Sequence, residues 1–335
     1  MNFRNEVKVM EYLLNIIFIL LNCLNSDVKP RKVVRVGNSY YVSLPKELVN
    51  DWGLTVGSLI AVEYRGSDAR LYPLIRFKEK GKERVTLISD EYLEKRIISA
   101  YLNGYDEIEL TIKGRREYVS KAIEKALRLL IGLEVVEEDY KRVLLQCFTG
   151  GDYNVYSIIR RLDYLSRSMY LDAIKSLREG RELASSVIER DDKVDRLYFF
   201  AVRLIRKSFR EEFKSREELL RLLDCRLVAK SLEEIGDRGE AIAREVERGL
   251  KATKTAYEQL YYHASEIASF QKRLIKSFVN NEPLDIGEVE ELTSKILKEL
   301  RELIKSREAS YLSIVEYLKA IVREVKDVYD LIKRC

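Results

Sequence analysis

The most constraining feature of this chain is a series of six long segments with helical periodicity in its C-terminal half. In each segment apolar residues recur every three or four positions, the spacing of an amphipathic helix that buries one face. Short breaks separate the segments, among them Gly180, Lys214-Ser215, Gly249 and Asn281-Glu282-Pro283, so consecutive helices should run antiparallel. We predict an all-α domain over residues 152–335, formed by two three-helix bundles, residues 152–250 and 251–335. The segments are Val155–Leu177, Arg181–Phe213, Glu217–Leu250, Thr255–Val279, Ile286–Ser306 and Ala309–Ile332.

Residues 29–78 have the pattern of a small strand-rich unit. Turn signals at Gly37-Asn38-Ser39 and Gly66-Ser67-Asp68 separate short alternating runs, which is typical of hairpins. So few residues cannot bury enough apolar surface alone. We therefore expect an intertwined homodimer of swapped hairpins, whose folding depends on association. The predicted strands are Lys32–Val36, Tyr40–Leu44, Leu59–Tyr64 and Ala69–Leu74, with a short helix at Lys46–Asp51.

Residues 84–148 alternate between strand and helix periodicity, which predicts a small α/β domain. The expected fold class is thus multi-domain α+β: a swapped-hairpin β domain, this α/β domain and the helical domain. We find no phosphate-binding loop or catalytic motif here and interpret the domain as a spacer or oligomerisation element. The expected strands are Val85–Ile88, Glu107–Ile112, Leu133–Glu137 and Tyr140–Cys147, and the expected helices are Asp90–Leu102 and Arg116–Leu130.

Residues 1–28 contain an apolar run, Tyr12–Leu24, that is too short to span a bilayer. They are either a leader added by an upstream start codon, a short docking helix or a membrane segment, and we expect no stable membrane insertion. The four cysteines are Cys23, Cys147, Cys225 and Cys335, and none forms a C-x-x-C pair. Such scattered cysteines indicate a reducing, cytoplasmic compartment.

The net charge of +5 is concentrated in one short segment. Residues 29–84 carry 12 Lys and Arg against 6 Asp and Glu, a net +6, and residues 1–28 carry −1. Residues 85–335 are therefore neutral as a whole. A localised excess of positive charge is the electrostatic signature of a nucleic-acid-binding surface.

Two predicted helices each carry a pair of carboxylates spaced four residues apart: Asp191 with Asp195, and Glu233 with Asp237. Residues four apart share a helix face, so each pair costs roughly 0.2–0.5 kcal/mol unless it is neutralised. Neighbouring helices would bring all four together, and divalent or iron cations bind such oxygen-rich sites. The alternative is a solvated acidic face neutralised by nearby basic residues: Lys193, Arg196, Lys230 and Arg238.

The chain has one histidine, His263, in the run Tyr261-Tyr262-His263-Ala264 of a predicted helix. We interpret it as a packing or surface residue. Serine and cysteine residues lack a local base motif, and one histidine cannot support most hydrolase schemes. We therefore predict that the protein is not an enzyme and list no catalytic residues.

The stretch RKVVRVGNSYYVSLPKEL, residues 31–48, continues through Trp52-Gly-Leu-Thr-Val-Gly57. It resembles the SpoVT/AbrB swapped-hairpin domain, with Ser58 in place of the usual acidic residue. Such domains bind DNA as dimers through basic residues of the first strand and its loop. The resemblance implies a DNA-binding set of Arg31, Lys32, Arg35, Asn38, Ser39 and Lys46.

The stretch RLVAKSLEEIGD, residues 226–237, resembles the signature helix of PhoU, the phosphate-signalling regulator, and residues 187–195 resemble the preceding PhoU helix. PhoU proteins have two three-helix bundles, and some bind multinuclear metal clusters at E/D-x-x-x-D motifs. The resemblance implies metal ligands at Asp191, Asp195, Glu233 and Asp237. In the second bundle the motifs are degraded, because Leu292 follows Glu288 and Ala320 follows Glu316 at plus four.

Together the domains resemble archaeal-type phosphate uptake regulators. The resemblance implies a DNA-binding transcriptional regulator of phosphate uptake and homeostasis, with DNA, a second copy of the chain and a phosphate ABC transporter as partners. Two alternatives remain. One is a PhoU-like adaptor that negatively regulates such a transporter by protein contact and never binds DNA. The other is a metal-dependent hydrolase built on the four carboxylates.

Overall fold

The computed structural model describes residues 31–65, 68–74, 82–149, 153–210, 216–305 and 312–332. The leader predicted at residues 1–28 lies outside them. The chain divides into two compact units between residues 80 and 81. Within the described residues, no helix is long and apolar enough to cross a membrane.

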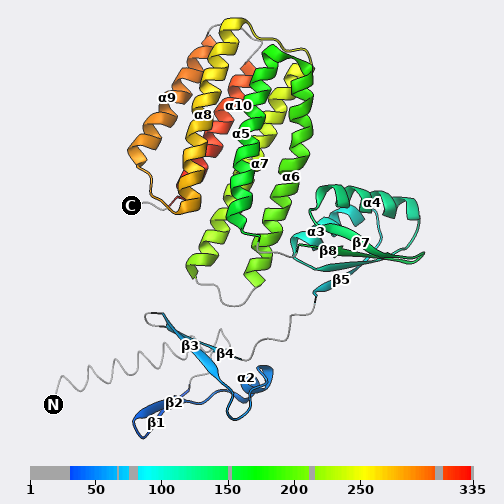
Figure 1. Ribbon diagram of the computed structural model, residues 1–335, viewed down its shortest axis with the longest axis vertical. Coiled ribbons are helices and arrows are strands. Elements are labelled where there is room, and N and C mark those ends of the chain that lie inside the picture. Colours follow the sequence, from blue (N-terminus) through cyan, green and yellow to red (C-terminus); the bar gives the residue numbers. More distant parts are fainter. Residues whose placement is uncertain are drawn as a thin grey trace, which may run out of the picture. The chain divides into compact units, whose positions relative to one another are not determined.

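The described residues of the first unit form two hairpins and one short helix (Figure 1). β1 and β2 pair antiparallel around a tight turn in which Gly37 has a φ of +63°. β3 and β4 form a second, separate two-stranded sheet. Pro73 is the only buried residue among those described from 31 to 74. The elements are β1 (Val33–Val36), β2 (Ser39–Val42), α2 (Lys46–Asp51), β3 (Ile60–Arg65) and β4 (Asp68–Pro73).

The second unit begins with a four-stranded sheet of order β5-β6-β8-β7. β5 and β6 are parallel, while β8 is antiparallel to both β6 and β7. Helices α3 and α4 cover one face of the sheet, and their apolar residues close a core on Ile108 and Leu145 (Figure 1). The elements are β5 (Arg84–Ile88), α3 (Leu93–Leu102), β6 (Glu107–Thr111), α4 (Arg116–Leu129), β7 (Leu133–Glu138) and β8 (Arg142–Cys147).

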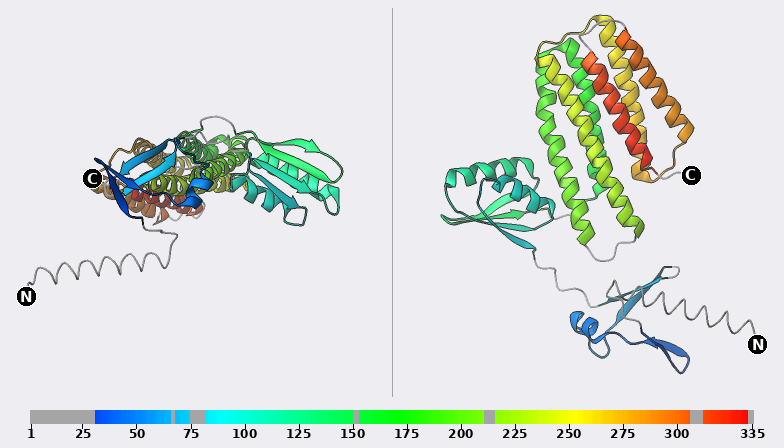
Figure 2. Two further views of the ribbon diagram at one scale, coloured as in Figure 1. Left: turned by 90° about the horizontal axis from the view of Figure 1, so that it is seen from below. Right: turned by 180° about the vertical axis from the view of Figure 1, so that it is seen from behind.

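Six antiparallel helices form the remainder of the second unit (Figure 2). α5, α6 and α7 pack together as one set, and α8, α9 and α10 form the other. The sets join through contacts of α5 with α8 and of α7 with α10, so one apolar core runs through both. The helices are α5 (Val155–Glu179), α6 (Arg181–Arg210), α7 (Arg216–Glu247), α8 (Lys254–Asn280), α9 (Ile286–Lys305) and α10 (Leu312–Asp330).

α6 also contacts the α/β domain through α3 and α4. Arg203 of α6 is fully buried, donates a 2.6 Å hydrogen bond to the carbonyl oxygen of Tyr101, and lies over the Tyr101 ring. Lys207, one turn further along, pairs with Asp106 at 2.8 Å. The expected fold class, multi-domain α+β with a six-helix domain, is thus confirmed, whereas hairpin exchange between two chains stays a prediction.

Candidate metal centre and nucleic-acid surface

Four carboxylates from two neighbouring helices meet between α6 and α7. Asp191 and Asp195 lie one turn apart on α6, and Glu233 and Asp237 lie one turn apart on α7. Oxygens of Asp191, Asp195 and Asp237 lie within 4.8 Å of one another, as do oxygens of Glu233, Glu234 and Asp237. Asp237 belongs to both groups, so the four residues expected from the sequence lie together. We call Asp191, Asp195, Glu233 and Asp237 the acid cluster.

Two glycines on α7 allow the helices to approach this closely. A Cβ atom at Gly236 would lie 3.1 Å from Cγ1 of Val194 on α6. A Cβ at Gly239 would lie 2.9 Å from the backbone nitrogen of Tyr170 on α5, a distance that real side chains do not adopt. Gly236 lies between Glu233 and Asp237 on α7. It allows a close approach to Val194, which lies between Asp191 and Asp195 on α6.

The acid cluster is electrostatically unfavourable without a counter-charge. Burial raises the pKa of Asp191 to about 7, and repulsion from Glu240 and then Asp195 adds to the effect. Burial also raises the pKa of Asp237 to about 6, with the charge of Glu233 as the next cause. The pKa of Asp195 is raised mainly by burial and then by Asp237. Each carboxylate therefore resists ionisation beside the others.

Cations on α7 neutralise only one side of the acid cluster. Lys230 pairs with Glu233 at 2.5 Å and with Glu234 at 2.7 Å, and Arg238 pairs with Glu234 at 3.3 Å. By contrast, Oδ1 of Asp191 is buried and has no hydrogen-bond partner among the described residues. The α6 side of the cluster is thus the part that would gain most from a bound cation.

The donor set fits a hard or borderline cation. Carboxylate oxygens are the ligands that divalent cations and iron accept in oxygen-rich sites. An unpartnered, buried oxygen at Asp191 and mutual repulsion among the carboxylates fit such an ion better than a solvated acidic face. Lys193 and Arg196, considered from the sequence as neutralising residues, are exposed on α6.

Two acidic residues near the acid cluster were not among the expected ligands. Glu240 lies three residues after Asp237, so it continues the same helix face, and it pairs with Arg244 at 2.5 Å. The spacing of three residues from Asp237 could have identified Glu240 from the sequence. Glu324 comes from α10, and its pKa is raised mainly by burial, partly offset by a hydrogen bond with Ser231. No local sequence pattern links α10 to this site.

In the second helix set, the residues at the degraded motif positions are engaged in ion pairs. Glu288 of α9 pairs with Arg273 of α8 at 2.5 Å. Glu316 of α10 pairs with Lys319 on the same helix at 2.6 Å. A cation at either position would have to displace a basic side chain.

The two described cysteines are poorly suited to nucleophilic chemistry. Burial raises the pKa of Cys147 to about 11 and that of Cys225 to about 12. Because the thiolate is the reactive form, both thiols are inert packing residues at neutral pH.

The six residues expected to contact DNA are all exposed in the first unit. Arg31 and Lys32 precede β1, while Lys46 opens α2. Arg35 lies on β1, and its Nε donates a 3.0 Å hydrogen bond to the carbonyl oxygen of Gly37 in the turn. The remaining two, Asn38 and Ser39, occupy the turn and the first position of β2.

The register divides the first hairpin into two faces. Arg35 is paired with Tyr40, so both side chains point to one face together with Val33 and Val42. The opposite face carries Val34, Val36, Ser39 and Tyr41. Arg35 and Ser39 therefore do not share a face, although both are near the turn. The valine and tyrosine side chains on both faces are more than half exposed.

Family models match two separate parts of the chain. Residues 33–78 match the model described as antidote-toxin recognition MazE, bacterial antitoxin. Residues 159–246 match the PhoU domain. Residues 159–246 are thus similar to a PhoU domain. The PhoU match contains all of the acid cluster and spans parts of α5 and α7 and the whole of α6.

Two solved PhoU structures are similar to part of the chain. One is the phosphate transport system regulatory protein PhoU from Streptococcus pneumoniae, with 16% identity over 53% of this chain and 91% of that chain and a TM-score of 0.44. The other is PhoU from Pseudomonas aeruginosa, with 17% identity, 53% and 93% coverage and a TM-score of 0.41. No curated protein matches the chain.

Proposed function

We propose that this protein is a DNA-binding transcriptional regulator of phosphate uptake and homeostasis that acts in the cytoplasm as a homodimer. The observation that carries the proposal is the presence in one chain of a MazE match at residues 33–78 and a PhoU-domain match at residues 159–246. The first unit would bind DNA, and the helical domain would report phosphate status to it. In this view the protein is a regulator rather than an enzyme.

Charge and exposure support the assignment of DNA binding to the first unit. The segment from residue 29 to 84 holds the excess positive charge of the chain. Arg31, Lys32 and Arg35 are exposed at the start of the first hairpin, where phosphates could reach them. A homodimer would place two such hairpins around a two-fold axis, which suits a symmetric DNA site.

A bound cation offers a physical basis for a signal in the helical domain. A divalent or iron cation held by Asp191, Asp195, Glu233 and Asp237 would offset the burial and the mutual repulsion that raise their pKa values. It would also link α6 to α7. Because Arg203 of the same α6 contacts Tyr101 of the α/β domain, a shift of α6 would be transmitted toward the N-terminal part of the second unit.

The salt dependence of DNA binding tests the proposal. The protein is titrated onto duplex DNA from the region upstream of its own gene between about 50 and 200 mM salt, a range in which phosphate contacts change affinity steeply. Each Lys or Arg that contacts a phosphate contributes about 0.9 to the log–log slope. Arg31→Ala with Arg35→Ala should lower the slope by up to about 3.6 in a dimer and weaken binding.

A matched control removes the same charge from the second unit. Arg128 and Lys251 are exposed there, so Arg128→Ala with Lys251→Ala should leave affinity and slope unchanged. Equal behaviour of the two double variants would refute DNA contact by the first hairpin.

A second candidate is an adaptor that docks on a phosphate ABC transporter and does not bind DNA. An exposed apolar stripe on α7 favours it, because Leu220, Leu223 and Leu227 share one helix face and are each about half exposed. This candidate predicts no DNA binding at physiological salt. It also predicts that Leu220→Ser with Leu227→Ser abolishes co-purification with the transporter, whereas the regulator would retain its DNA affinity in that variant.

A further inference from the structure

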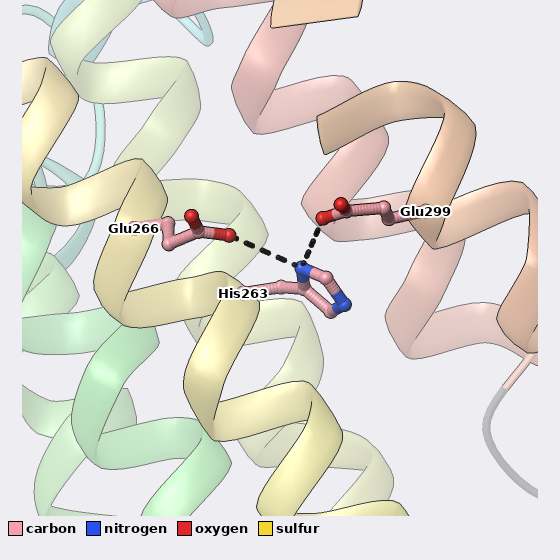
Figure 3. Close-up of side chains that lie close together, drawn as sticks. All are labelled: His263, Glu266 and Glu299. Atoms are coloured by element: carbon pink, nitrogen blue, oxygen red, sulfur yellow. Dashed lines mark ion pairs between the residues drawn. The ribbon is translucent and has the colours of Figure 1, made fainter. Parts of the chain in front are cut away.

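His263, Glu266 and Glu299 form a second polar cluster, located between α8 and α9. His263 and Glu266 lie three residues apart on α8, so they share a face, and Glu299 reaches them from α9. Figure 3 shows the three side chains pointing toward one another. One ligand atom from each lies within 4.8 Å of the other two. The cluster is separate from the acid cluster, whose carboxylates come from α6 and α7.

The histidine of this cluster is buried, and the central atoms of all three residues are unsatisfied. The histidine is only 7% exposed. Nδ1 of His263, Oε2 of Glu266 and Oε2 of Glu299 are buried without a hydrogen-bond partner among the described residues. Such groups normally cost free energy unless something occupies the space between them. All three lie around the same point.

Hydrogen bonding between the residues does not explain the arrangement. Nδ1 of His263 is 3.5 Å from Oε2 of Glu266 and 3.7 Å from Oε2 of Glu299. Hydrogen bonds between nitrogen and oxygen have distances of about 2.7–3.2 Å. An imidazolium that bridged two carboxylates would be expected to draw them closer, because charge-assisted bonds are shorter still.

The same separations fit ligands that share one metal ion. Zinc binds histidine nitrogen and carboxylate oxygen at about 2.0–2.2 Å in tetrahedral geometry, which places neighbouring ligand atoms about 3.4 Å apart. The two observed separations are close to that value. One histidine and two carboxylates would leave the fourth position for water.

The nearby cation Lys295 does not contact the unsatisfied atoms at the centre of the cluster. Lys295 of α9 is half exposed and pairs with Oε1 of Glu266 at 3.3 Å, on the opposite side of the carboxylate from the unsatisfied Oε2. The Tyr262 side chain also forms a hydrogen bond with Glu266. Both residues thus restrain Glu266 from outside, as partners of metal-ligating carboxylates do.

We infer that His263, Glu266 and Glu299 form a binding site for one divalent transition-metal ion of the zinc class, which links α9 to α8. Imidazole as a ligand favours zinc or a similar transition metal over Mg²⁺ and Ca²⁺, which prefer all-oxygen sites. The helical domain would therefore hold two sites of different chemistry: an all-oxygen site between α6 and α7, and this mixed site between α8 and α9.

The single histidine makes the test specific. The full chain is produced without a histidine tag and with isotope-labelled histidine, so that its only imidazole signals belong to His263. Zn²⁺ is then added at neutral pH. We expect the imidazole resonances to move to a new position in slow exchange and to saturate at one equivalent in a background carrying Asp191→Asn and Asp237→Asn. Zinc bound to cysteine would leave these signals unchanged.

Two single variants test the carboxylate ligands, and a third serves as the control. Glu266→Gln and Glu299→Gln should each weaken the response to Zn²⁺ at least about 100-fold, since the loss of even an outer partner of a metal ligand costs 10–100-fold. Glu258→Gln is the matched control, because Glu258 is an exposed glutamate on the same helix α8. It should bind as the parent does.

Two results would overturn the inference. One is an imidazole signal that does not respond to Zn²⁺ in the parent protein. The other is a response of unchanged affinity in both Glu266→Gln and Glu299→Gln, which would mean that the histidine binds the ion without them. Helical circular dichroism of the metal-free variants verifies folding, and if a variant does not fold, the titration of the parent decides the question.

Discussion

The two strand-rich regions of this chain differ in what they do with their apolar side chains. In β1 and β2, Val33, Val34, Val36, Tyr40, Tyr41 and Val42 are each 53–70% exposed. In β6 and β8 of the second unit, Ile108, Leu110 and Leu145 are fully buried. The strands in the two regions are of similar length, four to six residues. Strand length therefore does not account for the difference.

The difference lies in the layer that covers each sheet. α3 and α4 pack on one face of the four-stranded sheet and close its core. The described residues of the first unit offer only α2, a helix of six residues with no buried side chain. A two-stranded hairpin with two apolar faces is not stable alone in water. The homodimer proposed above would supply a second apolar surface for these strands.

The largest expected effect comes from placing charge on the hairpin face that lacks Arg35. If Arg35 faces DNA, the face carrying Val34 and Tyr41 is the one that the second copy covers. Val34→Asp with Tyr41→Asp should raise the dimer dissociation constant at least about 100-fold, because unpaired buried carboxylates cost several kcal/mol. Light scattering coupled to size exclusion measures the change.

Two controls make that prediction specific. Val136→Asp introduces a single aspartate on β7 of the second unit, where Val136 is 38% exposed, and should leave the dimer intact. Val33→Asp, on the Arg35 face, should impair DNA binding but not association. A dimer that survives Val34→Asp with Tyr41→Asp would mean that this face is not the interface.

The next effect concerns the contact that ties the α/β domain to α6. Arg203→Ala removes a buried guanidinium that donates to the Tyr101 carbonyl and lies 3.6 Å from Asp106. Loss of one partner from a buried charge network costs about 3–5 kcal/mol. Urea unfolding followed by circular dichroism should show that loss. Lys207→Ala, which removes the half-exposed partner of the same Asp106, should cost about 0–1 kcal/mol. Equal losses of stability in the two variants would contradict the larger role assigned to Arg203.

Much of the second unit was predictable because its patterns are long. Six helices of 19–32 residues repeat their apolar positions many times, so their existence followed from the sequence. Their ends were less predictable. The helix expected from Asp90 begins at Leu93, because the Asp90 carboxylate accepts a hydrogen bond from the backbone nitrogen of Tyr92 and forms a turn. Local side-chain bonds of this kind compete with helix formation.

The candidate sites, too, were predictable from the sequence only in part. The acid cluster was predictable because each helix displays its pair at a spacing of four. The cluster at His263 was not, and interpreting that residue as packing or surface missed Glu266 and Glu299. His263 and Glu266 share a helix face, but Glu299 comes from α9. Which residue of α9 lies opposite depends on how the two helices pack, and no local pattern in the sequence specifies that.

A smaller effect tests how tightly the bundle core is closed. Gly239→Ala should destabilise the protein by about 1–2 kcal/mol, because overpacking costs about 1–3 kcal/mol and alanine returns up to about 1 kcal/mol of helix propensity. Its Cβ would meet backbone on α5 at 2.9 Å. Gly236→Ala meets only a valine methyl at 3.1 Å and should be near neutral. Thermal unfolding of both variants measures the difference, and equal melting temperatures would contradict it.

A comparably small effect concerns the like charges of the acid cluster. The pKa of Asp191 is about 7 in the folded protein and about 3.8 in the unfolded chain. Between these values the folded state binds more protons, so the free energy of unfolding of metal-free protein should fall as pH rises from about 4 to 7. Asp191→Asn should remove part of this slope and stabilise the metal-free protein at pH 8 by about 1–2 kcal/mol, allowing for partial solvent screening.

Added metal and a control variant test whether repulsion within the acid cluster causes this pH dependence. The alternative is that any exposed carboxylate on α6 would have the same effect. Adding Mn²⁺ or Fe²⁺ should stabilise the parent at pH 8 and have a smaller effect on Asp191→Asn, since the ion needs the carboxylate that the variant lacks. Glu189→Gln removes one charge from an exposed position on the same α6 and should change neither the slope nor the response to metal. If Asp191→Asn instead loses stability at pH 8 in the presence of a chelator, Asp191 must be charged and well compensated there. The acid cluster would then not destabilise the metal-free bundle. Of the two regions, only the first hairpin, with its exposed apolar side chains, would carry an unfavourable surface.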